Sequence, residues 1–276
     1  MLNRAQWRAD AQGDAHSFVK IARFLSARVI KLTGNLIKGL CYCFYILAPQ
    51  KRFLIPHRAP PLLSRPSKHL IPKIIWQTNF TDKVTIAVYL NYLFNRILSP
   101  TYEYRFMDDA EQAEFIQANY PTEIFDAYSK LQIGAARADL WRVLILNKFG
   151  GVYLDMDAHV VWPLGYMIKP HYKELYMRHR DQMRTNYFIA SDKQNPHLDL
   201  VIAAILENIA DGKDGDVFTV TGPLVLHRAL EALDLPTAYY QHSCYQGTFT
   251  NEFFQYVDHP QGKWVRAQEH IPVVKR

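Results

Sequence analysis

The segment 150–157, Gly-Gly-Val-Tyr-Leu-Asp-Met-Asp, constrains the fold of this 276-residue chain most, because it predicts a buried strand that ends in two carboxylates. Its glycine pair ends the helical pattern of residues 134–149. Asp155 and Asp157 are two residues apart, so they project from one face of an extended chain. Such a pair loses hydration and repels itself unless a cation or hydrogen-bond donors neutralise it. Oxygen ligands of this kind fit Mg²⁺ or Mn²⁺ shared with a phosphate, although an isolated Asp-x-Asp more often caps a turn.

The positive charge of the chain is confined to its N-terminal part. The formal net charge is +6, but residues 1–81 hold 13 Lys and Arg against 2 Asp. No acidic residue occurs between Asp14 and Asp82, and the remainder has more acidic than basic residues. This asymmetry argues against nucleic-acid binding by the body and for contact between the N-terminal arm and an anionic surface.

Apolar residues recur along this arm at helical spacing: Phe18, Ile21, Leu25, Val29, Leu32, Leu36, Leu40, Phe44 and Leu47. With Lys and Arg between them, they predict a basic amphipathic helix that lies on an anionic membrane through residues 17–48. A bilayer crossing needs about 20 uncharged residues, and Lys31 and Lys38 interrupt the stretch. A signal peptide is disfavoured because the apolar segment starts late. Two alternatives stay open: a helix docked on the body through its apolar stripe and, less favoured, an RNA-binding arm.

The chain divides into three predicted regions. Residues 1–48 form the arm, residues 49–70 a Pro-rich basic linker, and residues 71–276 the catalytic domain. Within the last region, strands expected near 73–78, 102–107, 152–154, 174–178 and 186–190 alternate with helices. The helices are expected at 82–98, 109–119, 122–130, 134–149, 196–210 and 223–233. This order predicts an α/β fold with a mainly parallel sheet flanked by helices.

The cysteine usage suits a reducing compartment, because the chain has an odd number of cysteines without metal-ligand spacing. Cys41 and Cys43 are too close for an ordinary disulfide, and both lie in the apolar part of the arm. S-acylation of either residue is therefore a hypothesis that stays open.

Four separated motifs resemble glycosyltransferase family 32, the family with a sugar-binding region containing an Asp-x-Asp motif. They are residues 71–78 (Ile-Pro-Lys-Ile-Ile-Trp-Gln-Thr), the run 135–142 (Ala-Ala-Arg-Ala-Asp-Leu-Trp-Arg) followed by 150–157, residues 221–223 (Thr-Gly-Pro), and His259 with Trp264. The family includes fungal initiating mannosyltransferases and α-1,4-linking sugar transferases. This chain departs from it at Trp76, where histidine is usual, and at Lys263, where serine is common. The resemblance implies a GT-A (Rossmann-like) fold, a nucleotide-sugar donor, a divalent metal and retention of anomeric configuration.

The resemblance also implies a metal site made by Asp155, Asp157 and His259. Asp157 would ligate an Mn²⁺ or Mg²⁺ ion that bridges the two phosphates of the donor. Asp155 would contact the ribose or a metal-bound water, and His259 would complete the coordination through a neutral ring nitrogen. A surface position for His259 is the equal alternative.

Asp139 and Arg142 lie three residues apart, so they share one helix face next to the metal strand. In the functional interpretation Asp139 accepts hydrogen bonds from sugar hydroxyls and Arg142 binds sugar or phosphate. In the structural one they form an ordinary ion pair. The predicted catalytic residues are Asp139, Arg142, Asp155 and Asp157. The predicted donor-binding residues are Trp76, Gln77, Thr78, Arg137, Asp139, Arg142 and Asp155, with Trp76 either stacking on the base or packing in the core.

These patterns predict a metal-dependent, retaining glycosyltransferase, peripheral on the cytoplasmic side of a membrane. It would transfer a sugar from a UDP-sugar, rather than a GDP-sugar, to a glycan or lipid-linked acceptor in cell-surface polysaccharide, lipopolysaccharide or glycolipid synthesis. No nucleic-acid partner is expected. The alternatives are a non-catalytic sugar-binding or scaffold protein and, less favoured, a haloacid-dehalogenase-type phosphohydrolase. The latter expects Thr or Val where this chain has His159.

Overall fold

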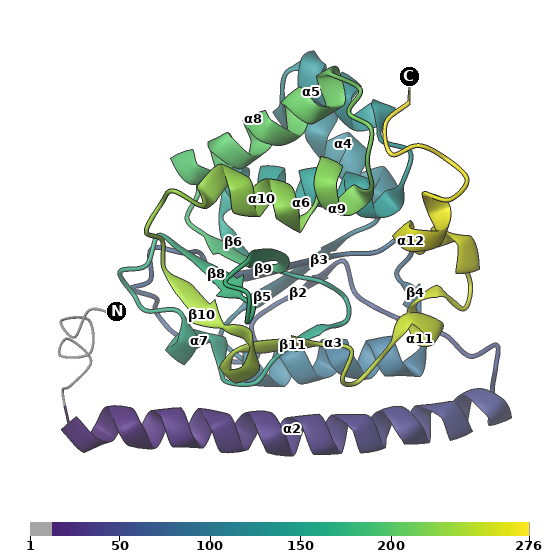
Figure 1. Cartoon of the computed structure of the whole chain (residues 1–276). Helices are drawn as coiled ribbons and strands as arrows, with labels where there is room; N and C mark the ends of the chain where they lie inside the picture. Colours follow the sequence, from purple (N-terminus) through teal and green to yellow (C-terminus); the bar gives the residue numbers. More distant parts are fainter. Residues whose placement is uncertain (1–12, 276) are drawn as a thin grey trace.

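The computed structural model describes residues 13–275, with side chains from residue 19 onward, so residues 1–12 of the predicted arm lie outside the described part. A central sheet of seven strands lies between two groups of helices (Figure 1). Its spatial order is β10-β8-β9-β6-β3-β5-β2. The strands are β2 (Arg58–Ala59), β3 (Ile74–Thr78), β5 (Glu103–Met107), β6 (Gly151–Leu154), β8 (Glu174–Arg178), β9 (Arg184–Ser191) and β10 (Thr237–Tyr239).

The direction of the strands confirms the predicted α/β class. The pairs β10–β8, β6–β3 and β3–β5 are parallel, whereas β2–β5, β6–β9 and β8–β9 are antiparallel. All strands except β9 and β2 therefore run in one direction, which makes the sheet mainly parallel.

Alternating side chains of the central strands enter two separate hydrophobic cores. In β6, Tyr153 packs into one core, while Val152 and Leu154 pack into the other. In β3, Trp76 and Ile75 divide in the same way. A strand buried on both faces requires this period of two, which explains the continuous apolar run of the sequence.

Helices cover both faces of the sheet (Figure 1). The first core lies under α4, α5, α6, α8, α9 and α10, and the second lies under α3. The bounds are α3 (Ile86–Leu98), α4 (Asp109–Asn119), α5 (Thr122–Lys130), α6 (Gly134–Phe149), α7 (Leu164–Met167), α8 (Pro196–Ala210), α9 (Val217–Val220) and α10 (Pro223–Leu230). The C-terminal part adds the 3-10 turn η1 (Tyr240–His242), α11 (Glu252–Tyr256), the 3-10 turn η2 (Pro260–Gly262) and α12 (Trp264–Ala267).

Two small sheets attach outlying segments to this body. β1 (Phe53–Leu54) pairs antiparallel with β4 (Lys83–Val84), and β7 (Ala158–Val160) pairs antiparallel with β11 (Cys244–Gln246). β1 and β2 both lie inside the predicted Pro-rich linker. That segment is therefore attached to the sheets of the body along part of its length.

The predicted N-terminal helix is present as α2 (Gly13–Leu47), which lies along the outside of α3 (Figure 1). Ala27, Gly34 and Cys41 face the body and are buried. A Cβ atom at Gly34 would lie 2.6 Å from Cγ2 of Thr248, so glycine permits the close approach. The helix is thus docked, as one sequence alternative held. The face that docks has Ala27, Gly34 and Cys41 at its centre, with Ile30, Ile37 and Tyr45 packed beside them, and most of the predicted apolar stripe lies on the other side. Within residues 13–275, no helix combines the length and apolar character needed to cross a membrane.

Candidate active site

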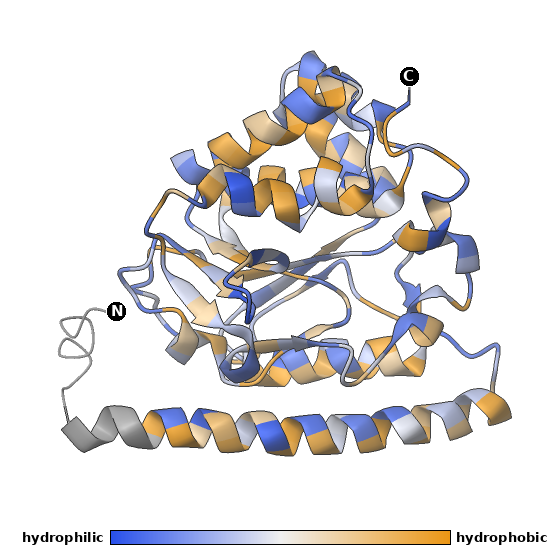
Figure 2. Ribbon diagram, viewed as in Figure 1, coloured by the Kyte–Doolittle hydropathy of each residue, from blue (hydrophilic) through white to orange (hydrophobic). Residues whose placement is uncertain are grey.

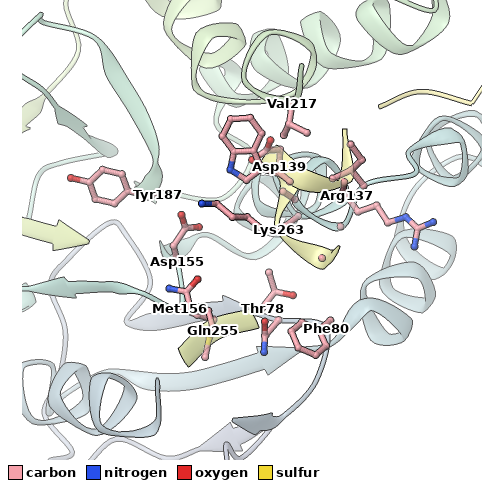
Figure 3. A pocket seen from close by; sticks show the side chains of 18 of the residues that line it. Thr78, Phe80, Arg137, Asp139, Asp155, Met156, Tyr187, Val217, Gln255 and Lys263 are labelled. Carbon is pink, nitrogen blue, oxygen red and sulfur yellow. The ribbon is translucent and has the colours of Figure 1, made fainter. Parts of the chain in front are cut away.

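A cavity of about 990 Å³ opens at the carboxyl ends of β3 and β6 (Figure 3). Ligand sites of open α/β sheets lie at this edge, where the strand direction exposes the loops that follow the strands. Most of the predicted site residues line the cavity: Thr78, Arg137, Asp139, Arg142, Asp155, Asp157 and His259. The fold therefore brings these residues, which are up to 181 positions apart in the sequence, to the wall of one cavity.

Two predicted donor-binding residues lie outside the lining. Trp76 is fully buried, its indole N–H donates to the Gly150 carbonyl at 2.9 Å, and its ring stacks on Phe149. Gln77 is also fully buried, and its amide donates to the backbone carbonyl of Asp155 at 3.0 Å. The structure thus places Trp76 in the core, which is the packing alternative of the two that the sequence left open. Gln77 instead holds the chain at Asp155.

The glycine pair before β6 allows the sharp change from helix to strand. Gly150 and Gly151 have φ angles of 66° and 114°, which L side chains rarely adopt. A Cβ atom at Gly150 would lie 2.7 Å from Cδ of Pro72, and one at Gly151 would lie 2.7 Å from the carbonyl oxygen of Ile74. The pair therefore brings α6 and β6 together and sets Asp155 and Asp157 at the cavity edge.

Both carboxylate oxygens of Asp139 have hydrogen-bond partners inside the protein. Its Oδ1 accepts from Asn186 Nδ2 at 2.8 Å and its Oδ2 from the Thr221 hydroxyl at 3.0 Å. The Arg142 guanidinium lies 3.1 Å from Oδ1 and donates to the Asn186 carbonyl at 2.8 Å. Burial raises the pKa of Asp139 to about 6, although Arg142 and these donors favour its charged form.

Arg142 also connects the helix to the Asp-x-Asp pair. Its Nη1 lies 3.4 Å from Asp155 Oδ1, and its guanidinium stacks over the Tyr153 ring, 4.4 Å from the centroid. The Tyr153 hydroxyl donates to the same oxygen of Asp155 at 2.7 Å. Arg142 is therefore shared by two carboxylates and holds Asp155 in position.

Among the described residues, no Lys or Arg forms an ion pair with Asp157. Gln246 donates from one amide nitrogen to Asp155 Oδ2 at 3.1 Å and to Asp157 Oδ1 at 3.2 Å. Burial and the charge of Asp155 raise the pKa of Asp157 to about 6. The pair thus retains the like-charge repulsion that a bound cation would remove.

The donor chemistry of this edge fits a hard divalent cation. Asp155 and Asp157 offer carboxylate oxygens, and rotation of the Gln246 amide would add a carbonyl oxygen. His259 lines the same cavity, but its ring packs on Phe80, with centroids 5.3 Å apart. Among the described residues, no three His, Cys, Asp or Glu side chains are gathered closely enough to hold a metal. A ligand role for His259 therefore stays a prediction that requires the C-terminal segment to move.

Several lining residues had no signal in the sequence. They are Met183, Asn186, Tyr187, Gln246, Glu252, Gln255 and Tyr256. Gln246 comes to the aspartates because β11 pairs with β7, which places Gln246 opposite Ala158. Lys263 extends into the cavity (Figure 3) and pairs with Glu252. Only the tertiary fold brings these polar residues to the carboxylates.

Comparison with known proteins agrees with this geometry. Residues 87–177 match the model of the family described as glycosyltransferase sugar-binding region containing DXD motif. Inositol phosphoceramide mannosyltransferase 3 of Schizosaccharomyces pombe is 36% identical over 91 residues, 32% of this chain and 24% of that protein. Inositol phosphoceramide mannosyltransferase 2 of the same yeast is 31% identical over 183 residues, 63% of this chain and 51% of that protein.

A further relative is the initiation-specific alpha-1,6-mannosyltransferase of S. pombe, 32% identical over 92 residues, 32% of this chain and 23% of that protein. The chain thus spans about a quarter to a half of the length of these relatives. The solved structure of PaToxG glycosyltransferase superimposes with a TM-score of 0.50 at 18% identity, covering 78% of this chain and 79% of that one. The resemblance to family 32 and the GT-A fold are both confirmed.

Proposed function

From its place in the family of the Asp-x-Asp sugar-binding region, we propose that this chain is a metal-dependent, retaining glycosyltransferase that uses a nucleotide-diphosphate sugar. One observation carries the proposal. Asp155 and Asp157 stand together at the carboxyl end of β6 on a cavity of about 990 Å³, and Asp157 forms no ion pair with a cation of residues 19–275. A cavity of this size accommodates a ligand as large as a nucleotide sugar.

Each polar residue of the cavity has a definable task in this proposal. Asp157, Asp155 and the Gln246 amide would hold Mn²⁺ or Mg²⁺, which supplies positive charge to the diphosphate leaving group. Arg142 keeps Asp155 oriented, because it contacts that carboxylate from the buried side. Asp139 acts through Arg142, since its own oxygens already have partners within the protein. Lys263 at the opposite wall offers a second positive charge for a phosphate.

The donor and the acceptor follow from weaker signals. A UDP-sugar remains the prediction from sequence, and the names of the fungal relatives add mannose donors to the possibilities. Two relatives are named for an inositol phosphoceramide substrate, which favours a lipid-linked acceptor over a free glycan.

Transfer would proceed by front-face attack, with the leaving phosphate taking the proton of the acceptor hydroxyl. A covalent sugar adduct on the protein, seen by mass spectrometry, would contradict that step.

Nucleotide release tests the proposal. The full chain is incubated with UDP- and GDP-sugars, including GDP-mannose, with Mn²⁺ or with chelator. We expect release from one donor that requires the metal, is lost in Asp157→Asn and is kept in Asp126→Asn, an exposed aspartate on α5.

Two outcomes would favour the alternatives. Donor binding in calorimetry without release, even when lipid and glycan acceptors are supplied, would indicate a sugar-binding protein. Hydrolysis of p-nitrophenyl phosphate would indicate a phosphohydrolase.

A further inference from the structure

We propose that the outward face of α2 is a binding surface for an anionic lipid bilayer, which would hold the enzyme peripherally on a membrane. This face, called the ridge below, consists of Ile21, Leu25, Val29, Leu32, Leu36, Leu40 and Leu47. Its members are between 55% and 85% exposed, and Leu32 and Leu47 reach 75% and 85%. An exposed apolar surface along a helix of 35 residues indicates a partner outside the chain.

The body leaves the ridge uncovered because α2 docks through its opposite side. Ser26 donates to the Val161 carbonyl at 2.8 Å, and Lys38 donates to the Gly247 carbonyl at 2.8 Å. Ala27 packs on Val161 and Tyr245. The buried positions Ala27, Gly34 and Cys41 are seven residues apart, so they lie on one face of the helix. Figure 2 shows hydrophobic residues along the coloured part of α2, with the body on one side of the helix only.

The charge beside the ridge selects the kind of partner. Arg28 stacks over Phe24, and Lys31 lies over Tyr245, at 4.9 Å and 5.3 Å from the ring centroids. Within residues 19–47, no Lys or Arg forms an ion pair with a carboxylate of the described chain. The sequence from 15 to 81 contains no acidic residue that would repel lipid phosphates. An apolar ridge beside unpaired cations matches the surface of an anionic bilayer.

The same docking connects the ridge to the candidate active site. Gln246 of β11 contacts Asp155 and Asp157. The next residue, Gly247, accepts from Lys38 of α2. A single strand thus separates the carboxylates from the membrane helix. An acceptor anchored in that bilayer would then be held on the same side of the body as β11, and this last step alone rests on the proposed function.

Vesicle binding tests the ridge without requiring catalysis. The full chain is sedimented with vesicles of phosphatidylcholine alone and with vesicles that contain phosphatidylglycerol. We expect binding to the anionic vesicles, and a loss of about tenfold or more in the double variant Leu32→Gln/Leu36→Gln, since each leucine contributes buried apolar area. Leu200→Gln, an exposed leucine on α8 that is 49% accessible, should bind like the wild type.

Each other outcome overturns the proposal. A wild-type chain that stays in the supernatant with both vesicles, or a double variant that binds equally well, would exclude the ridge as the lipid surface. A dimer in solution that Leu32→Gln/Leu36→Gln converts to a monomer, without vesicle binding, would assign the ridge to a second copy. Because the assay contains no nucleotide sugar, failure of the donor-release experiment would leave its result unaffected.

Discussion

Asp139 lies on α6 with Arg142, and Asp157 follows β6. The two carboxylates differ in where their partners come from. Asp139 receives two neutral donors and a guanidinium from within the chain. Asp157 receives the Gln246 amide and faces the like charge of Asp155. Asp139 therefore belongs to the folded structure, whereas under the proposed function Asp157 would be completed by a bound cation. The two sides of α2 differ in the same way, since one side contacts the body and the other contacts nothing in the described chain.

Removal of Asp139 should produce the largest effect, on stability. Asp139→Ala leaves the buried Arg142 without its nearest carboxylate, so we expect the free energy of unfolding to fall by about 3–5 kcal/mol. Urea titration followed by circular dichroism measures the change. The double variant Asp139→Leu/Arg142→Met should recover most of it, because it removes the unpaired charge as well. A single variant as stable as the wild type would show that Asp139 is not part of the folded framework.

Removal of Asp157 should instead affect turnover. We expect Asp157→Asn to reduce metal-dependent nucleotide release by about 100- to 1000-fold, a magnitude typical of losing a charge-stabilising group. Its melting temperature at pH 7 should equal or exceed that of the wild type, because the variant relieves repulsion from Asp155. Differential scanning fluorimetry with and without Mn²⁺ provides the control. An Asp157→Asn variant that melts at a lower temperature than the wild type and is still stabilised by Mn²⁺ would show that Asp157, like Asp139, supports the folded structure.

His159 is a buried group without a polar partner among the described residues. Neither of its ring nitrogens forms a hydrogen bond within residues 13–275, and burial lowers its pKa to about 3. The unfolded chain takes up a proton near the ordinary pKa of about 6.5, so folded stability is lost as the pH falls from that value toward 3. At pH 5 the loss amounts to about 2 kcal/mol.

His159→Phe should remove this loss and keep the ring contacts with Phe94, Tyr245 and Phe249. Unfolding measured at pH 5 and pH 7.5 tests it, with the exposed His171→Phe as the control. An unchanged acid dependence would mean that His159 has a partner after all.

Substitution of Gly34 or Gly39 in α2 should produce the smallest effect. Gly39→Ala introduces a Cβ with nothing within 4 Å, and should stabilise the helix by about 0.5–1 kcal/mol. Gly34→Ala places its Cβ against Thr248, and overpacking costs about 1–3 kcal/mol. We therefore expect Gly34→Ala to be less stable than Gly39→Ala in thermal melts. Equal stabilities would show that α2 does not contact the body through this face in solution.

Elements with strong local signals were predictable from sequence. The predicted helices 109–119, 122–130, 134–149 and 196–210 have the bounds of α4, α5, α6 and α8, and the predicted strand 174–178 has those of β8. Pro121 begins one of these helices, and Gly150 ends another. The Asp-x-Asp pair was predictable for the same reason, because its strand is short, apolar and bounded by glycines.

Features that depend on distant contacts were not predictable. Thr221 lies 82 residues from Asp139, and Gln246 lies 89 residues from Asp157. A periodic sequence pattern gives no information on such distant pairs. The hydrogen bonds to Asp139 and the position of the Gln246 amide between Asp155 and Asp157 are therefore seen only in the folded structure. The face of α2 that contacts the body was also not predictable, because its small residues do not stand out in the sequence beside a strong apolar stripe. β1 and β2 escaped prediction since proline-rich sequence disfavours strands.

The distribution of thiols offers a practical consequence. Cys41 and Cys244 are buried, whereas Cys43 is exposed and lies seven residues from Leu36, on the ridge side of the helix. A maleimide dye should therefore label the native protein at one position. A polarity-sensitive fluorophore there would shift to the blue when the helix enters lipid, and aqueous iodide would quench it less. Insertion of α2 into lipid can thus be followed in the wild-type sequence through a dye on Cys43, with no cysteine to remove or to introduce.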